Sequence, residues 1–319
     1  MVFEKASSLS ALIVISALLL APFPAAGQEK DDLRLLFTGD ILLTRQVEVE
    51  LNRTVRSPWS GLQKLFRSAT WVGGNFEGAI GPTSNCLGSK SPCFATPETA
   101  AELLRRSGFR LVTVENNHAG DLGSSGREKS ANVLEQAGLL VVDFNNSPHV
   151  IQLGKTSIAV VAITLIPAAD GRVQHIPSAE VSEKLRLARQ RANLVVVSIH
   201  WGSELMAWPS DSQRKEAAWL VREGADVILG HHPHVIQRPE CVSGTPVFFS
   251  LGNHLFDQAN PKTKDGMIAD CRVLRGRLRC QGLRTHTESG TTFPSTAIPD
   301  RTADSTLATC TPRIAPVLH

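Results

Sequence analysis

The sequence has little excess charge and no block of basic residues. Its 33 Lys and Arg stand against 30 Asp and Glu, which leaves a formal net charge of +3, and no segment interleaves basic with aromatic side chains. Proteins that bind nucleic acid usually present such a basic patch, so nucleic acid is not an expected partner. A hydrophobic content of 42% and a charged content of 20% over 319 residues are typical of a folded globular chain.

The apolar run at residues 9–20 is short for a membrane-spanning helix, which needs about 20 apolar residues. Pro22 and Pro24 end the run, and the small residues 25–27 follow it. This pattern is typical of a secretory signal peptide with its cleavage site. We therefore expect residues 1–27 to be a signal peptide and the mature chain to be secreted or extracytoplasmic, in the cell envelope or periplasm. A retained single anchor is the alternative.

The six cysteines include no Cys-x-x-Cys pair, which argues against a cysteine zinc site. Their number fits an oxidising compartment, where disulfides form. Cys271 and Cys280 flank a predicted hairpin. If Arg275-Gly276 is its two-residue turn, the two cysteines face each other at a closely spaced pair, within disulfide range. The sequence therefore predicts this bridge.

The other four cysteines are assigned by position. Cys86 and Cys93 flank a loop of Gly, Ser and Pro, and we expect them to form a second bridge. Cys241 and Cys310 remain, and their pairing would tie the end of the chain to the domain.

Apolar runs alternate with segments of helical spacing along most of the chain. Strands are predicted over 33–37, 111–114, 158–163, 194–199, 226–229 and 247–250; helices are predicted over 58–68, over 97–107 with Thr96 as the cap, from Ser124 or Ser125 to 137, over 179–191, and from Ser210 or Asp211 to 222. This alternation indicates an α/β architecture. We expect one domain over 28–283 and an irregular tail over 284–319, because the tail is rich in Ser, Thr and Pro and has few large apolar residues.

Side chains of metal-ligand type follow the predicted strands. In chain order they are Asp40; Asn75 and Glu77; Asn117 and His118; His200; and His231, His232 and His234. Open α/β sheets place their sites at the carboxyl ends of the strands. A mixture of carboxylates, imidazoles and an amide oxygen suits two divalent cations that share a hydroxide.

Each of these residues alone also has an ordinary structural explanation. Asp40 could be a turn residue, and Asn75 and Asn117 could shape loops. His200 could be a strand-end histidine whose hydrogen bonds are satisfied by neighbouring residues. Clustering so many polar groups without a partner is costly. The ordered set at five strand ends therefore favours a site.

Several motifs occur in an order that resembles the capsule-synthesis protein family for poly-γ-glutamate (CapA-type), a relative of the calcineurin-like metallophosphoesterases. They are Gly39-Asp40 with Arg45, Asn75-Phe76-Glu77, Asn116-Asn117-His118 with Asp121 and Gly123, His200-Trp201-Gly202 with Glu204, Gly224-Ala225-Asp226, Gly230-His231-His232-Pro233-His234, and Ser250-Leu251-Gly252-Asn253. The resemblance implies an α/β fold, a calcineurin-like metallophosphoesterase sandwich of β-sheets flanked by helices.

The resemblance also implies a role for each residue of the motifs. It assigns metal binding to Asp40, Glu77, Asn117, His200, His231 and His234, catalysis to His118 with Asp40, and support of these ligands to Asn75, Asp121, Glu204 and Asn253. The cofactors would be divalent ions, two of them, drawn from Mn, Fe, Zn and Mg. His232 is expected to face elsewhere, because alternate residues of an extended segment face opposite ways.

Gly252-Asn253-His254 also spells a metallophosphoesterase motif, but it follows the histidine cluster instead of preceding it. We therefore place Asn253 beside the site and keep His254 only as a minor candidate.

Two functions from different classes remain. The first is a secreted metal-dependent hydrolase of the poly-γ-glutamate capsule synthesis family, acting on a phosphoester or an amide of a capsule or cell-envelope polymer, with His118 protonating the leaving group. The alternative is a non-catalytic polymer-binding or export accessory factor of capsule biosynthesis. Either would take an anionic or amide-linked polymer, and membrane capsule-synthesis proteins are the expected partners.

Overall fold

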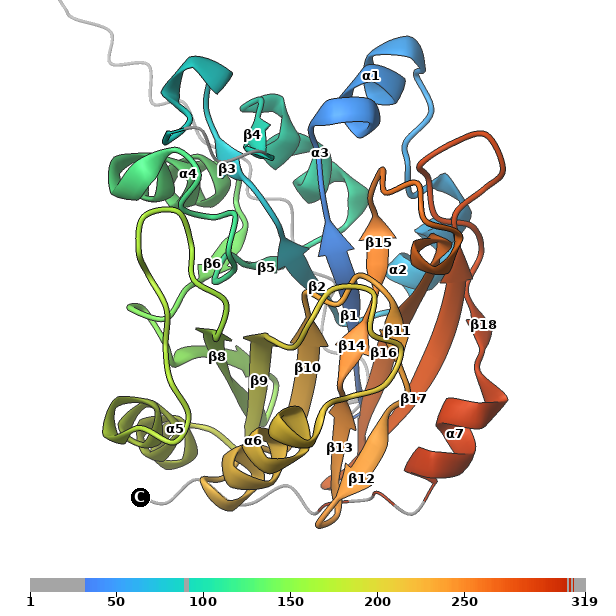
Figure 1. Ribbon diagram of the computed structural model, residues 1–319. Helices are drawn as coiled ribbons and strands as arrows, with labels where there is room; N and C mark the ends of the chain where they lie inside the picture. The colour runs from blue at the N-terminus through green and yellow to red at the C-terminus, as the bar shows by residue number, and fades with distance from the viewer. Residues whose placement is uncertain (1–31, 89–91, 309, 311, 313–319) are drawn as a thin grey trace, which may run out of the picture. The chain divides into compact units, whose positions relative to one another are not determined.

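The computed structural model describes residues 32–88, 92–308, 310 and 312. The predicted signal peptide, residues 1–27, lies outside these residues. Among the described residues, none of the helices combines the length and the apolar composition of a membrane span. The strands form two large sheets and two short pairs (Figure 1).

The first large sheet has the strand order β18-β17-β16-β1-β2-β5-β6, with β15 also paired to β1. Its strands are β1 (Leu33–Ile41), β2 (Trp71–Phe76), β5 (Leu111–Thr113), β6 (Leu140–Val142), β15 (Asn253–Leu255), β16 (Asp265–Leu274), β17 (Arg277–His286) and β18 (Ile298–Pro299). β1, β2, β5 and β6 run parallel to one another. Their carboxyl ends therefore lie along one edge.

The second large sheet has the order β12-β13-β10-β9-β8-β7. Its strands are β7 (His149–Leu153), β8 (Thr156–Thr164), β9 (Leu194–His200), β10 (Val227–His231), β12 (Glu240–Val242) and β13 (Thr245–Phe248). The four strands β8, β9, β10 and β13 are parallel. The short pairs are β3 (Ala79–Ile80) with β4 (Ala95–Thr96), and β11 (Ile236–Gln237) with β14 (Ser250–Leu251).

The two large sheets pack face to face because their central strands are apolar on both sides. In β1, Leu35 and Phe37 join a core cluster that also holds Val196 and Leu229 of the second sheet. Leu36, between them, packs on the outer side with the helices. Strands of this kind read as nearly continuous apolar runs, which is typical of parallel sheets covered on both faces.

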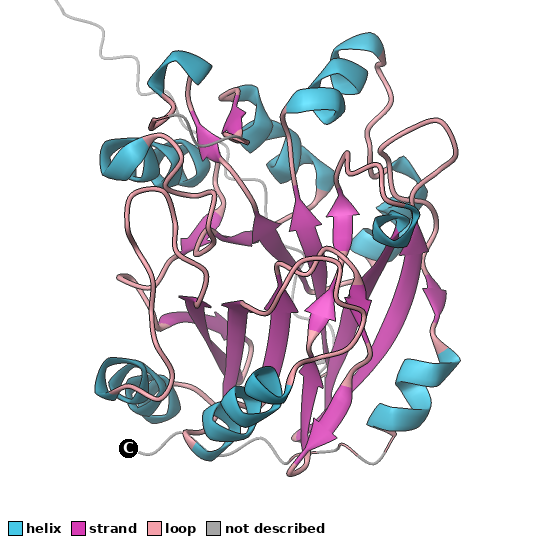
Figure 2. Cartoon of the chain, in the orientation of Figure 1, coloured by secondary structure: helices cyan, strands magenta, loops and turns pink. Residues whose placement is uncertain are grey.

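Helices cover the outer faces of both sheets (Figure 2). One outer core joins the first sheet to α1 (Arg45–Arg53), α2 (Gln63–Arg67), α3 (Thr99–Ser107) and α4 (Gly123–Gln136); another joins the second sheet to α5 (Ala179–Arg191) and α6 (Asp211–Arg222). The predicted α/β sandwich of sheets flanked by helices is confirmed. The structure also has short 3-10 helices at Ser60–Leu62, Thr83–Asn85 and Pro261–Lys264.

Two predicted boundaries were wrong. The helix predicted from residue 97 begins at Thr99, and Thr96 belongs to β4 instead of capping the helix. The tail predicted to be irregular from residue 284 contains the end of β17, all of β18 and α7 (Arg301–Leu307). Its few apolar residues suffice, because Ala303 and Leu307 are buried in the core between the sheets.

All three predicted disulfides are present. Cys271 lies opposite Cys280 in the β16–β17 register, as the two-residue turn requires. Cys86 is bonded to Cys93, and Cys241 to Cys310. The last bridge ties the end of the described chain to β12.

Removing the Cys241–Cys310 bridge is expected to destabilise the protein more than removing the Cys86–Cys93 bridge. The first closes a loop of 69 residues and the second a loop of 7. Loop-closure entropy predicts losses of about 4 and about 2 kcal/mol, respectively. Urea unfolding of the Cys241→Ser/Cys310→Ser and Cys86→Ser/Cys93→Ser double variants measures both losses, and the reverse order would contradict the entropic argument.

Candidate metal centre

The carboxyl ends of β1 and β2 bring three polar side chains together. Asp40 pairs with Asn75 in the parallel register, and Glu77 follows β2 directly. Asn75 Nδ2 donates a hydrogen bond to Asp40 Oδ1 at 2.9 Å. All three side chains are buried, so two carboxylates lie inside the protein at one edge of the first sheet.

The carboxyl ends of β9 and β10 add histidines from the second sheet. His200 and His231 are the last residues of these strands and lie side by side in register. His231 Nδ1 lies 2.9 Å from Asp40 Oδ1, and the His232 backbone N–H donates to Asp40 Oδ2 at 3.2 Å. Asp40 therefore joins the ends of the two sheets.

His234 lies between the two buried carboxylates. Its Nδ1 is 3.5 Å from Asp40 Oδ2, and its Nε2 is 3.7 Å from Glu77 Oε1. Asn253 of β15 fixes the ring, because its Oδ1 lies 2.9 Å from His234 Nδ1. Asp40, Glu77 and His234 each offer one ligand atom, and these atoms lie within 4.8 Å of one another. This spacing suits a single cation.

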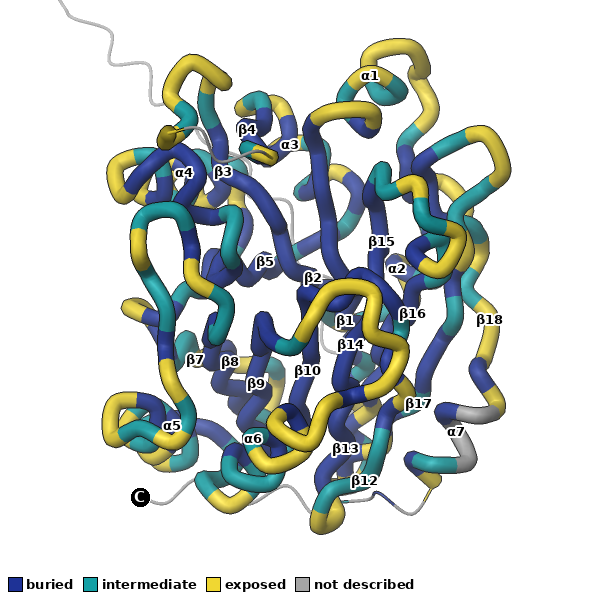
Figure 3. Tube along the Cα trace, in the orientation of Figure 1, coloured by how far each residue is buried: buried dark blue, intermediate teal, exposed yellow. Residues whose placement is uncertain are grey.

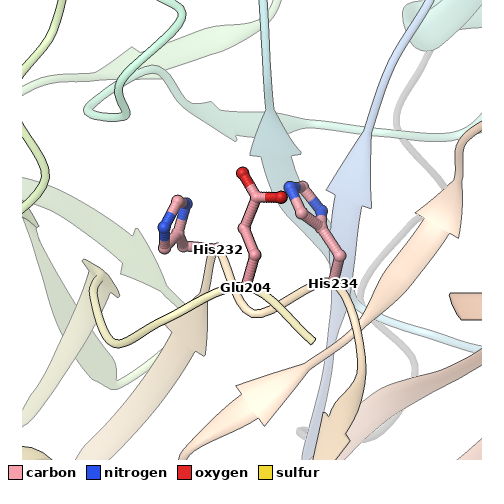
Figure 4. A group of neighbouring side chains, drawn as sticks. All are labelled: Glu204, His232 and His234. Atoms are coloured by element: carbon pink, nitrogen blue, oxygen red, sulfur yellow. The ribbon is translucent and has the colours of Figure 1, made fainter. Parts of the chain in front are cut away.

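A second group of possible ligands shares His234. Ligand atoms of Glu204, His232 and His234 also lie within 4.8 Å of one another, and Figure 4 shows the Glu204 carboxylate between the two imidazoles. Glu204 comes from the exposed segment 203–208, which follows β9 (Figure 3). The centre is therefore buried on the side of Asp40 and Glu77 and open on the side of Glu204.

His232 was expected to face away from the other histidines, and that expectation was wrong. The alternation of side chains holds only for extended backbone. His232 has φ 93° and His234 has φ 56°, so the segment after β10 is not extended. Its turn brings His232 and His234 to the same group.

The two buried carboxylates have opposite pKa shifts. Burial raises the pKa of Asp40, but the hydrogen bond from His231 and the electrostatic interaction with the neighbouring imidazoles outweigh it and lower the pKa. Burial, together with the negative charges of Asp40, Glu204 and Asp121, holds the pKa of Glu77 well above its usual value.

The Glu77 carboxylate lacks a hydrogen-bond donor in the part of the chain that the structure describes. Neither of its carboxylate oxygens has a hydrogen-bond partner among the described residues. A buried carboxylate without a donor is strongly disfavoured. A bound divalent cation would remove this penalty, and carboxylate with imidazole is a donor set that Zn, Mn and Fe accept. The residues present therefore fit a metal.

His200 is held in the neutral form that binds metals. Burial first, and then the neighbouring His232, lower the pKa of His200 well below its usual value. Its Nε2 lies 2.8 Å from Asn117 Oδ1 and 4.0 Å from Glu77 Oε1. His200 of the second sheet thus contacts both Asn117, which follows β5, and Glu77, which follows β2.

His118 is oriented by Asp121 and Phe94. Its Nδ1 lies 2.9 Å from Asp121 Oδ2, which also accepts a hydrogen bond from the Phe94 backbone N–H at 2.6 Å. The His118 ring stacks on the Phe94 ring with centroids 3.7 Å apart. Because a carboxylate accepts the Nδ1 proton, the Nε2 atom of His118 is left for other partners.

The structure thus gathers the predicted residues at one edge, with Asn75, Asp121 and Asn253 each bonded to one of the others. Sequence reasoning missed Phe94, whose only signal is its position directly after the Cys93 bridge. His254, the minor candidate, does not join the group. It lies among Trp59, Phe66 and Phe109, where burial lowers the pKa of its imidazole to about 3.

Known capsule-synthesis proteins resemble this chain over about three quarters of its length. Residues 34–258 match the family model described as "Bacterial capsule synthesis protein PGA_cap". The chain is 29% identical over 255 residues to the PGA biosynthesis protein CapA of Bacillus subtilis (strain 168), covering 75% of this chain and 67% of that protein. It is 28% identical over 266 residues to the capsule biosynthesis protein CapA of Bacillus anthracis, covering 77% and 65%. The matched part therefore spans about two thirds of each relative.

A solved structure shares the fold. The crystal structure of a phosphatase from Mycoplasma pneumoniae superposes with a TM-score of 0.51 at 14% identity, covering 85% of this chain and 93% of that chain. The expected sandwich of β-sheets flanked by helices is confirmed, and this phosphatase structure shares it. Because the family model spans more than half of the 319 residues and includes all the residues of the candidate metal centre, the chain belongs to the bacterial capsule synthesis (PGA_cap) family.

Proposed function

We propose that the chain is an exported, divalent-metal-dependent hydrolase that acts on a capsule or cell-envelope polymer. The observation that carries this proposal is the Glu77 carboxylate, which is buried without a hydrogen-bond partner beside Asp40 and His234. Family membership supports the polymer, since the two relatives are called PGA biosynthesis and capsule biosynthesis proteins.

The residues that would hold the cations come from both sheets. They are Asp40, Glu77, Asn117, His200, His231 and His234, and the geometry adds His232 and Glu204. Divalent cations supply Lewis-acid activation of water and of the scissile group. Asn75 and Asn253 hold Asp40 and His234 in place by hydrogen bonds, and such outer partners fix the orientation of ligands.

His118 would transfer the proton. Asp121 takes the Nδ1 side of the ring, so the Nε2 atom can donate a proton to a leaving oxygen or nitrogen. Phe94 covers the ring face and keeps the imidazole in one orientation.

Replacing His118 by asparagine is expected to reduce hydrolysis by about 10²–10⁴-fold, because a positioned general acid contributes that much. Metal content should stay the same, since His118 belongs to neither group of closely spaced ligand atoms. Rates on phosphoester substrates and on poly-γ-glutamate, with metal analysis of the same samples, measure both effects. The control is His149→Asn in the edge strand β7. Equal loss in both variants would contradict the assigned role.

Metal analysis of the purified chain, followed by assays on phosphoesters and on poly-γ-glutamate, tests the proposal as a whole. Bound divalent metal and metal-dependent turnover of either substrate are the expected results. A chain that neither contains nor takes up divalent metal would overturn the proposal.

Export is proposed on two grounds. Residues 1–27 have the pattern of a signal peptide. The six cysteines form three disulfides, which persist in oxidising compartments.

The names of the relatives favour a second candidate, a polymer-binding or export accessory factor, because they refer to biosynthesis and not to cleavage. The double variant Asp40→Ala/His200→Ala separates the two functions. If polymer output in a capsule-producing cell survives the loss of metal binding, the accessory role is favoured; if output is lost, the hydrolase is favoured.

A further inference from the structure

The guanidinium group of Arg45 is a cation beside the metal centre, and the chemistry proposed above gives it no role. It begins α1, directly after the loop that follows β1 and Asp40. Its φ of 58° lies in the left-handed region. A non-glycine residue adopts that conformation at a cost in free energy, and such residues concentrate at functional sites.

Asp257 fixes the guanidinium group. Arg45 Nε lies 3.1 Å from Asp257 Oδ2, and Nη2 lies 2.8 Å from Asp257 Oδ1. The Gln46 backbone N–H also donates to Oδ2, and the Asp257 side chain is only 5% exposed. A guanidinium has five N–H donors; here Nε donates a hydrogen bond to Asp257 Oδ2, and Nη2 forms an ion pair with Oδ1. Nη1 makes no hydrogen bond to the described residues, and the Arg45 side chain is 39% exposed.

Only the Phe94 ring separates the Arg45 guanidinium from His118, the proposed proton donor. Its central carbon lies 5.2 Å from the centroid of Phe94, the ring that stacks on His118. Phe256 packs against both Phe94 and His234, with ring centroids at 5.8 and 4.8 Å. Through Phe94 and Phe256, Arg45 is therefore connected by packing contacts to both His118 and His234.

We propose that Arg45 binds an oxyanion of the substrate, a carboxylate or a phosphate, next to the group that reacts. The proposal rests on the proposed function and adds a specificity-determining residue to it. Asp40, Glu77, Glu204 and Asp121 make the centre acidic, so a fixed cation nearby would offset the repulsion of an anionic polymer. A planar guanidinium with a free edge suits both anions, because their oxygens accept two parallel hydrogen bonds.

Titration calorimetry of the full chain with two probes, inorganic phosphate and synthetic tetra-γ-glutamate, tests the proposal. Arg45→Gln is expected to weaken binding of one or both probes by at least about tenfold, the effect of losing a charged hydrogen bond. The probe that loses more identifies the anion. Arg53→Gln, which removes an exposed arginine from the same helix, should stay within about twofold of the wild type by the same measure.

Arg45→Gln leaves Asp257 unpaired and could fail to fold, so the double variant Arg45→Gln/Asp257→Asn, which removes the pair together, is measured as well. Wild-type protein that binds neither probe, or Arg45 variants that bind both as well as wild type, would overturn the proposal. Metal content is measured on the same samples with and without chelation. Protein that contains no metal but binds an anion through Arg45 would rule out the proposed hydrolase and support the anion site. Protein that contains metal but binds no anion through Arg45 would support the metal centre and rule out the anion site.

Discussion

Replacing Glu77 by glutamine is expected to weaken metal binding by more than about 100-fold and to leave the metal-free protein at least as stable as the wild type. Few substitutions should separate function from stability so clearly. Glu77 is fully buried, both of its carboxylate oxygens lack a hydrogen-bond partner, and neighbouring negative charges raise its pKa further. Within the metal-free fold, its charge is therefore a penalty.

Glutamine has the same shape as glutamate and no charge. The change removes the penalty of a buried carboxylate that has no hydrogen-bond donor among the described residues, so the free energy of unfolding of the metal-free protein should rise or stay unchanged. The same change removes an anionic ligand. Metal affinity should fall by more than about 100-fold, because even the outer partners of metal ligands contribute about 10–100-fold.

Competition with a fluorescent chelator measures the affinity, and urea unfolding in a chelator measures the stability. Asp270→Asn is the matched control. Asp270 is also buried, but it is paired with Arg34 at 2.9 and 2.7 Å and with Gln281 at 2.7 Å. That variant should lose about 1–3 kcal/mol of stability and keep its metal affinity. The interpretation of Glu77 as a ligand fails if Glu77→Gln loses stability and keeps the metal.

The edge where the site lies could be predicted from sequence because parallel strands end together. Asp40, His200 and His231 each follow an apolar run. The parallel strands of each sheet end at one edge, and the two edges meet where His231 contacts Asp40. The Cys271–Cys280 bridge was predictable for a similar reason, since a two-residue turn fixes the register of a hairpin.

Features set by irregular backbone could not be predicted in this way. His232 turns toward the centre because of its positive φ, and Glu204 reaches it from an exposed loop. Phe94 meets His118 only through tertiary packing. No periodic pattern in the sequence indicates these contacts.

The helices α1 and α7 show a second limit of prediction from sequence. α1 buries Val47 alone, so its apolar spacing is too weak to indicate a helix. α7 buries Ala303 and Leu307, and its position depends on the gap that the two sheets leave. Both segments are compatible with a helix, but packing against the rest of the protein, and not the local sequence, stabilises it.

Adding one methyl group at Gly39, the residue before Asp40, is expected to cost about 3 kcal/mol or more of stability. A Cβ atom there would lie 2.0 Å from the backbone oxygen of Gly252 and 3.1 Å from that of Leu251. These neighbours are backbone atoms and cannot rotate away. Gly39→Ala must therefore separate the β1 strand from the segment that leads into β15.

That separation would also disturb the centre, which makes Gly39→Ala a test of how the site is built. The Asp40 backbone N–H donates to Gly252 O at 3.0 Å, and Asp40 pairs with Asn253, the residue that holds His234. Metal affinity should therefore fall together with stability. Gly61→Ala is the control, because its Cβ would meet nothing closer than 3.6 Å, and it should change stability by less than about 1 kcal/mol. Urea unfolding and metal titration of both variants decide the question. If Gly39→Ala matches Gly61→Ala in both measurements, the close approach of Gly39 to Gly252 is not what positions Asp40.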